Sequence, residues 1–154
     1  QISKDKQKEY YTLGQQFARR ALKVNPNNSE DNFAMAISMG RIALISSGEE
    51  KINAVKDIKT YADRSIQLDP ANYKGYHVLG KWHYEVSDLS MMEKVLVKIT
   101  YGSLPESSLD DAIINYEKSM HLNPAFLLNY LELAKAYRKK GEKNKARSLL
   151  KQQQ

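Results

Sequence analysis

Three stretches of the chain share one pattern of apolar and polar positions, and each ends at a proline. They are "FARRALKVNP", "TYADRSIQLDP" and "DAIINYEKSMHLNP", which close at Pro26, Pro70 and Pro124. Small or apolar residues stand 5, 8 and 12 positions before each proline, which places them on one helical face. In chain order they are Gly14, Ala18 and Ala21; Ile58, Ala62 and Ser65; and Ala112, Tyr116 and Ser119. The residue before a proline avoids the α region, so each ending predicts a helix end.

A second amphipathic helix follows each proline. The corresponding stripes are Tyr130, Leu133, Ala134 and Tyr137; then Tyr76, Leu79, Gly80 and His83; and, more weakly, Asn32, Met35, Ala36 and Met39. Gly141 predicts a turn, and Ala146 and Leu150 begin the stripe of a last helix. The expected helices are 3–24, 29–46, 50–68, 72–87, 89–101, 108–122, 125–140 and 143–152. No strand-like alternation is present, and no long linker divides the chain, so we expect one all-α domain over residues 1–154.

This arrangement resembles the tetratricopeptide repeat (TPR), in which large residues on one helix pack beside small residues on the next. The resemblance implies a right-handed superhelix of stacked antiparallel helix pairs, about eight helices in all. The prolines lie 44 and 54 residues apart, whereas the plain repeat is about 34 residues long. Two insertions are therefore expected, near 45–57 and near 88–110.

The second insertion carries a more specific signal. The segment "GYHVLGKWHYEVSDLSMMEKVLVKITYGSLPESSLDDAIINYEKSMHLNP" resembles the regulator-of-microtubule-dynamics family, and the whole chain looks most similar to its bacterial members. The matching positions are Gly80, Lys81, Trp82, Tyr84, Val86, Leu89, Ser90, Glu93, Lys94, Tyr101, Gly102 and Pro105, with the helix of Ala112 and Tyr116. The resemblance implies protein–protein contacts, with microtubule association or phospholipid binding and tethering in some members, and no catalytic residue set.

The expected insertion helix, 89–101, is rich in apolar residues. They are Met91, Met92, Val95, Leu96, Val97, Ile99 and Tyr101. Because they cover more than one stripe, the pattern predicts a largely buried helix that plugs the stack or caps a groove. A hydrophobic pocket for an acyl chain, with methionine supplying adaptability, is the alternative.

Composition narrows the function classes only modestly. The chain has no Cys, which excludes disulfides and thiolate metal sites, and its net charge of +6 mildly favours acidic partners. No apolar run reaches the roughly 18–20 residues that span a bilayer. The chain begins with Gln1 and not Met, which fits an exported bacterial protein with its signal removed and equally a cytoplasmic one.

The sequence gives little support for a catalytic site or a metal site. His77 and His83 lie six residues apart, a spacing that does not share a helix face, and His83 occupies a packing position of the repeat. Neither a nucleophile elbow nor a phosphate-binding glycine loop occurs. Asp110 and Asp111 follow Ser108 as the first turn of a capped helix would. We therefore expect no enzyme, no cofactor and no metal. The basic run "YRKKGEKNKARSLLK" suits a solvated terminal helix better than nucleic acid.

The first helix of each TPR pair lines a groove, and the residues expected to face it mix cations with apolar groups. They are Phe33, Ile37 and Arg41; Lys74, His77, Lys81 and Tyr84; and Leu128, Leu131, Lys135 and Arg138. We expect this groove to hold an extended or helical acidic–hydrophobic segment of a protein or peptide, without catalysis. A phospholipid-binding or membrane-tethering module that uses the insertion helix is the alternative function.

The N-terminal helix raises a separate question, because its stripe of Tyr11, Gly14, Ala18 and Ala21 needs a partner. Upstream sequence, the helix expected at 29–46, or a second chain can each cover it.

Overall fold

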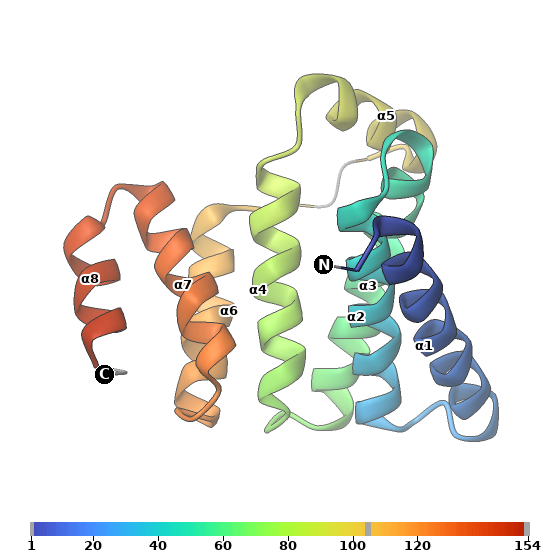
Figure 1. The fold of residues 1–154 in the computed structure, drawn as a ribbon, viewed down its shortest axis with the longest axis horizontal. Helices are drawn as coiled ribbons and strands as arrows, with labels where there is room; N and C mark the ends of the chain where they lie inside the picture. Colours follow the sequence, from blue (N-terminus) through green and yellow to red (C-terminus); the bar gives the residue numbers. More distant parts are fainter. Residues whose placement is uncertain (1, 104–105, 153–154) are drawn as a thin grey trace. The chain divides into compact units, whose positions relative to one another are not determined.

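The computed structural model describes residues 2–103 and 106–152. Within these ranges the chain forms eight α-helices and no strand (Figure 1). They are α1 (Lys4–Val24), α2 (Ser29–Ile45), α3 (Gly48–Leu68), α4 (Tyr73–Ser87), α5 (Met91–Tyr101), α6 (Leu109–Leu122), α7 (Leu127–Lys140) and α8 (Lys143–Lys151). The all-α class, the number of helices and the inserted helix are confirmed, and the expected boundaries differ from these by at most two residues.

The three repeated endings have one conformation. Asn25, Asp69 and Asn123, each directly before a proline, have φ/ψ of −139°/92°, −142°/96° and −143°/90°. Each backbone N–H still donates to the carbonyl four residues earlier. The helix therefore closes its last turn and then leaves the α region where the proline requires it. The prediction of helix ends is confirmed.

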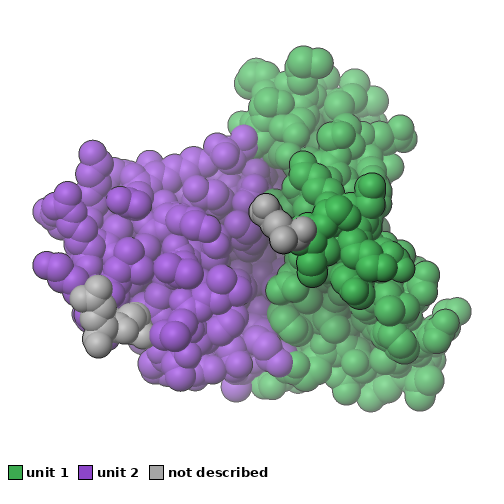
Figure 2. Space-filling view, viewed as in Figure 1, with its two compact units in different colours: residues 1–70, 89–106 green, residues 71–88, 107–154 purple. Residues whose placement is uncertain are grey.

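The helices group into two compact units, shown in different colours in Figure 2. Unit 1 comprises Gln1–Pro70 and Leu89–Glu106, and therefore contains α1, α2, α3 and α5. Unit 2 comprises Ala71–Asp88 and Ser107–Gln154, and contains α4, α6, α7 and α8. Helix α5 thus belongs to unit 1 although it lies in sequence between α4 and α6 of unit 2.

Small residues bring the helices of unit 1 close together. Ser29 at the start of α2 and Ser65 at the end of α3 each donate a side-chain hydrogen bond to the other's carbonyl, at 2.8 and 2.9 Å. Helix α1 packs on α2 through its small stripe, where Ala18 is buried and a Cβ at Gly14 would lie 3.3 Å from Ser38 Oγ. Of the three expected partners for this stripe, α2 is the one that covers it.

Unit 2 shows the large-against-small packing that the repeat pattern predicts. A Cβ added at Gly80 of α4 would lie 2.6 Å from the ring of Tyr116 on α6, and Tyr116 is fully buried. Ser119 Oγ donates to the Tyr73 carbonyl at 2.8 Å, which ties the end of α6 to the start of α4. The two helices therefore form an antiparallel pair although α5 separates them in sequence.

Helices α7 and α8 extend the same core. Tyr130, Leu133 and Ala134 are buried against α6, as their stripe predicts. Gly141 ends α7 with a left-handed φ of +91°, and the N–H of Glu142 donates to the Tyr137 carbonyl at 2.8 Å. The turn expected at this glycine is confirmed.

The expected burial of the insertion helix is wrong. Among the residues of α5, Val97 alone is fully buried, while Met91, Met92 and Ile99 are 75–78% exposed. The helix is attached to α3 on one side only, where Lys51 pairs with Glu93 at 2.9 Å and the Tyr101 hydroxyl donates to the Asn53 carbonyl at 2.5 Å. Apart from Val97 and Tyr101, the apolar residues of α5 are exposed.

Candidate interaction surfaces

The eleven predicted groove residues lie on three helices of the two units. Phe33, Ile37 and Arg41 lie on α2 of unit 1. The other eight belong to unit 2, with Lys74, His77, Lys81 and Tyr84 on α4 and Leu128, Leu131, Lys135 and Arg138 on α7. Helices α4 and α7 contact each other directly, so unit 2 brings these eight residues to one neighbourhood.

A cluster of paired charges joins α4 to α7. Lys81 donates to Glu132 at 3.0 Å and pairs with Glu85, one turn along α4, also at 3.0 Å. Lys135 donates to the other oxygen of Glu132 at 2.8 Å. Two lysines are thus balanced by two carboxylates, and Glu132 is 8% exposed. Lys81 therefore has a structural role in linking the two helices.

The pKa values in this cluster reflect the balance between burial and pairing. Burial, the largest single effect, raises the pKa of Glu132, but its hydrogen bonds from Lys135 and Lys81 more than offset it and lower that pKa. Burial likewise lowers the pKa of Lys81, while Glu132 and Glu85 together raise it. Both groups are consequently charged at neutral pH.

His77 lies inside unit 2. It is 5% exposed, and its ring Nδ1 lies 2.9 Å from Asn129 Oδ1. The Asn129 amide in turn donates to the Tyr116 carbonyl at 2.7 Å, so the oxygen of Asn129 accepts from His77. This chain of hydrogen bonds connects α4, α7 and α6. His77 is therefore a packing residue and is not accessible to a ligand.

Helix α7 carries an exposed band that we call the α7 stripe. It consists of Leu127, Leu128, Leu131, Lys135 and Arg138. Leu127 and Leu131 are 60% and 52% exposed, and Arg138 makes no ion pair with a described residue. The stripe is apolar at the start of the helix and basic toward its end. Leu127 was not among the predicted groove residues, although it stands one turn before Leu131.

Tyr84 lies beside the basic end of this region. Lys139 Nζ is 4.7 Å from the centre of the Tyr84 ring, a cation–π distance, and pairs with Asp88 at 2.6 Å. Lys81 approaches the same ring at 5.8 Å. Tyr84 is half-buried and packs against the core of unit 2. Tyr84 is therefore partly a packing residue and partly accessible.

The three predicted residues of unit 1 share one side of α2. Phe33 and Ile37 are half-buried and Arg41 is exposed. The Arg41 guanidinium lies 5.6 Å from the centre of the Tyr11 ring on α1. Arg41 thus packs over a neighbouring helix of its own unit.

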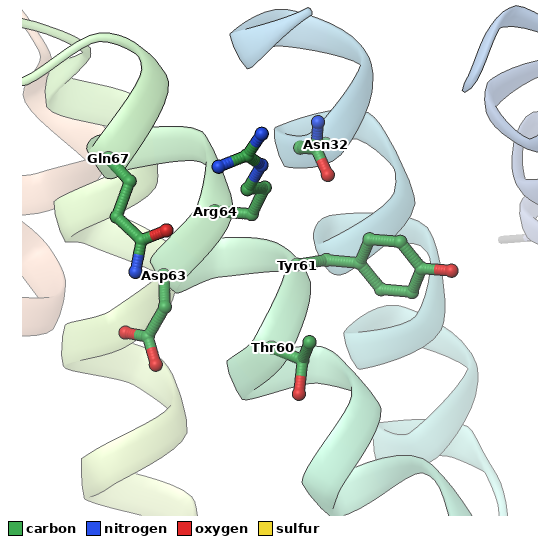
Figure 3. A pocket seen from close by; sticks show the side chains of 6 residues that line it. All are labelled: Asn32, Thr60, Tyr61, Asp63, Arg64 and Gln67. Atoms are coloured by element: carbon green, nitrogen blue, oxygen red, sulfur yellow. The ribbon is translucent and has the colours of Figure 1, made fainter. Parts of the chain in front are cut away.

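Unit 1 also contains a polar depression of about 370 Å³ between the start of α2 and the end of α3 (Figure 3). Its two charged side chains are paired with neighbouring residues: Arg64 donates to Asn27 at 2.6 Å, and Asp63 pairs with Lys59 at 2.6 Å. The Asn32 amide, also at its edge, donates to the backbone carbonyls of Pro26 and Asn28. The depression therefore holds no concentrated charge directed at a ligand.

Across residues 2–103 and 106–152, no three His, Asp or Glu side chains lie together as metal ligands would. In the same part of the chain, no helix is both long enough and apolar enough to span a bilayer.

The sequence interpretation named the apolar residues of α5 but missed that most of them are exposed. Met91, Met92, Val95, Leu96 and Ile99 form what we call the α5 apolar face, with exposed fractions between 44% and 78%. At about 100° per residue these five side chains occupy roughly 140° of the helix circumference. Val97 lies on the opposite side, and Lys94 and Lys98 follow one edge of the face. The sequence showed the apolar residues but gave no sign of which helix would cover them.

Comparison with known proteins identifies the family. The family model described as "Regulator of microtubule dynamics protein 1-3" matches residues 1–154. Regulator of microtubule dynamics protein 1 of Caenorhabditis elegans is 25% identical over 149 residues, which are 97% of this chain and 66% of that protein. Regulator of microtubule dynamics protein 2 of Rattus norvegicus is 31% identical over 140 residues, which are 90% of this chain but 34% of that protein.

Among solved structures, a monomeric mutant of IFIT1 with m7Gppp-AAAA matches 88% of this chain and 35% of its own. The TM-score is 0.50 and the sequence identity is 16%, so this similarity concerns the helical-repeat fold alone. The chain spans 66% of the nematode relative and about a third of the rat one. With a family model that covers all of its residues, the chain belongs to the regulator of microtubule dynamics family.

Proposed function

We propose that this chain is a non-catalytic scaffold that binds an acidic, partly apolar protein segment on the α7 stripe of unit 2. The observation that carries the proposal is the exposure of Leu127, Leu128 and Leu131 in line with Lys135 and Arg138 on one helix. Isolated exposed leucines are ordinary, but three within five residues form a contiguous apolar patch of the kind that marks binding sites.

Charge supports an acidic partner. From Leu127 to Lys151 the chain holds eight Lys or Arg residues and two Glu residues. Glu132 pairs with Lys81 and Lys135 and not with Arg138. An incoming carboxylate can therefore contact Arg138 without displacing one of its partners. Apolar contacts with the leucines would supply most of the affinity, and the cations would orient the segment.

The proposal assigns binding and no chemistry. The shifted pKa values of unit 2 belong to paired or packed groups, such as Glu132 and Tyr116, and not to a group set in a cleft. The relatives are named for regulating microtubule dynamics, but the chain spans 34% of the rat relative. We therefore carry over protein binding only.

A peptide-selection experiment tests this proposal. A displayed library of random twelve-residue peptides is selected on the immobilised chain and counter-selected on the Leu131→Glu variant. We expect the recovered peptides to contain Asp or Glu beside large apolar residues. Their affinity should fall at least tenfold in Leu131→Glu and in the Lys135→Glu/Arg138→Glu double variant. Phe17→Glu, on an exposed face of unit 1, is the matched control and should bind normally.

Equal affinity for the wild-type chain and the Leu131→Glu variant would overturn the assignment of the α7 stripe. Lys81 is unsuitable for this test, because its replacement would break the link from α4 to Glu132 and confound binding with stability.

We infer a second candidate function, membrane association, from the α5 apolar face. Five large apolar side chains on one exposed side of an 11-residue helix, edged by Lys94 and Lys98, have the pattern of an interfacial helix. The test is sedimentation with phosphatidylcholine vesicles, with and without phosphatidylserine. Ile99→Glu should abolish co-sedimentation, while Thr100→Glu, which lies outside the α5 apolar face on the side away from Lys94 and Lys98, should not. No co-sedimentation of the wild-type chain would rule the candidate out.

A further inference from the structure

Helix α1 has a second face that the packing of unit 1 leaves exposed. Its small stripe covers α2, but Tyr10, Leu13, Phe17 and Val24 are 48–88% exposed. Lys6 and Arg20 lie in the same line, with Lys6 over the Tyr10 ring at 5.6 Å and Arg20 over the Phe17 ring at 5.8 Å. We call these six residues the α1 seam: Lys6, Tyr10, Leu13, Phe17, Arg20 and Val24.

The spacing of the α1 seam is that of a helix-pairing surface. Its members follow one another at intervals of 4, 3, 4, 3 and 4 residues, the alternation by which one helix meets another along a narrow line. At about 100° per residue, all six fall within about 80° of the helix circumference. A membrane-surface helix needs a wider apolar face. The geometry therefore favours one partner helix over a lipid surface.

Comparison of equivalent helices within the chain shows that one position of this surface, Leu13, departs from the repeat pattern. Counted back thirteen positions from the three repeat prolines, Leu13 stands where α3 has Asp57 and α6 has Asp111. Both aspartates are exposed, as the outer side of a helical repeat normally requires. Helix α1 thus departs from its own repeat pattern by placing a leucine where its counterparts carry a charge.

Charge indicates the chemistry of the partner. Residues 4–24 contain six Lys or Arg residues against two Asp or Glu residues, a net charge of +4. Lys6 pairs with Glu9 at the exposed surface, and Arg20 makes no ion pair with a described residue. A second copy of the chain would bring two such helices together and repel itself.

We propose that the α1 seam docks one amphipathic helix of acidic character. The partner helix places apolar residues against Tyr10, Leu13 and Phe17, and carboxylates against Lys6 and Arg20. This site lies in unit 1 and does not depend on the proposed binding to the α7 stripe in unit 2.

A designed peptide tests the docking proposal. The probe is a blocked 21-residue helical peptide with leucine at heptad spacing and glutamate at its flanking positions, and the reference probe carries lysine in place of every glutamate. We expect the glutamate probe to bind the wild-type chain in fluorescence anisotropy. Binding should weaken at least tenfold in Phe17→Glu, weaken with added salt, and be absent with the lysine probe.

The control repeats the titration in the Leu131→Glu background, which removes the α7 stripe as a second site for an acidic, apolar peptide, and Phe17→Glu should weaken binding at least tenfold there as well. Phe17 is 60% exposed, so circular dichroism should show Phe17→Glu folded. Failure of the glutamate probe to bind, or equal binding by Phe17→Glu, would overturn the proposal. So would self-association in sedimentation velocity that Phe17→Glu abolishes, or vesicle binding that it abolishes, since these assign the seam to a second copy or to a membrane.

Discussion

At the residue scale, the pairing of Gly80 with Tyr116 determines how closely α4 and α6 approach. The tyrosine ring occupies the space that any side chain at position 80 would need. A glycine at this position of the sequence stripe, and a large aromatic residue on the following repeat helix, were both visible in the sequence. That the two meet could be inferred only from the resemblance to a helical repeat, because α5 separates them.

We predict that Gly80→Ala lowers the free energy of unfolding by about 1–3 kcal/mol, since the fully buried ring has nowhere to shift. Introducing Tyr116→Leu as well should reduce the cost of the alanine, which gives a coupling energy of at least about 0.5 kcal/mol in a double-mutant cycle. Urea denaturation measures all four variants.

The control is Gly40→Ala in α2, where an added Cβ meets nothing within 4 Å. Alanine there should stabilise the helix by about 0.5–1 kcal/mol. A Gly80→Ala variant as stable as the wild type would contradict the packing described for this pair.

Glu132 is, with Leu127, a residue of α7 that sequence reasoning missed. The three-residue spacing to Lys135 was a signal for one of its two ion pairs, but the pair with Lys81 joins residues 51 positions apart. Glu132 precedes Leu133 but does not belong to the apolar stripe of α7, so the pattern gave no reason to expect a buried carboxylate there. Long-range polar pairing depends on how two helices are rotated toward each other, which periodicity does not specify.

Glu132 should make the stability of the chain depend on pH. Its pKa in the folded protein is lowered from the ordinary value of 4.5 by Lys135 and Lys81, despite its burial. As pH falls below that value, the unfolded state takes up a proton first, so the contribution of Glu132 is present above pH 4.5 and is lost on acidification. We predict that Glu132→Gln costs about 1–3 kcal/mol at pH 7 and flattens the acid dependence.

Urea denaturation at a series of pH values between 7 and 3 checks this prediction. Asp110→Asn serves as the control, because the pair of Asp110 with Lys140 is exposed and should contribute little. If Glu132→Gln and the wild type lose stability in parallel on acidification, the ion pairs are not the cause.

At the scale of elements, the helices were predictable and their outer faces were not. Proline endings, the Ser108 cap, the Gly141 turn and the apolar stripes are signals within the sequence, and together they placed all eight helices. The apolar residues of α5 and α1 were equally visible, but periodicity only shows that a face is apolar. Burial of α5 was the wrong prediction because no described helix covers Met91, Met92 or Ile99.

The attachment of α5 to α3 yields a prediction for this element. Val97→Ala together with Tyr101→Phe removes the buried contact and the hydrogen bond to Asn53. Amide exchange over Met91–Tyr101 should then accelerate at least tenfold, while exchange in α4 and α6 stays unchanged, because a local opening involves few contacts. Ile99→Ala, at an exposed position, should leave exchange unaltered. Uniform acceleration through both units would instead mean that α5 supports the whole fold.

At the scale of the whole molecule, the chain combines two compact helical units, each with an exposed surface of its own. Unit 1 presents the α1 seam and the α5 apolar face, and unit 2 presents the α7 stripe. Four groove residues were predicted on α4, and three of them have structural roles. His77 is buried, Lys81 is paired with carboxylates, and Tyr84 packs on the core of unit 2. The residues predicted on α7 remain exposed, which is why the proposed function is assigned there.

The proposed function requires that a protein segment binds along the α7 stripe. The most direct measurement is methyl NMR of Leu128 and Leu131 during titration with a peptide selected on the wild-type chain. The methyl signals of both residues should shift and saturate at the dissociation constant measured independently, while the methyl signals of Leu13 and Ile99 in unit 1 should not shift. Saturated binding that leaves the α7 methyl groups unshifted would contradict the proposed function.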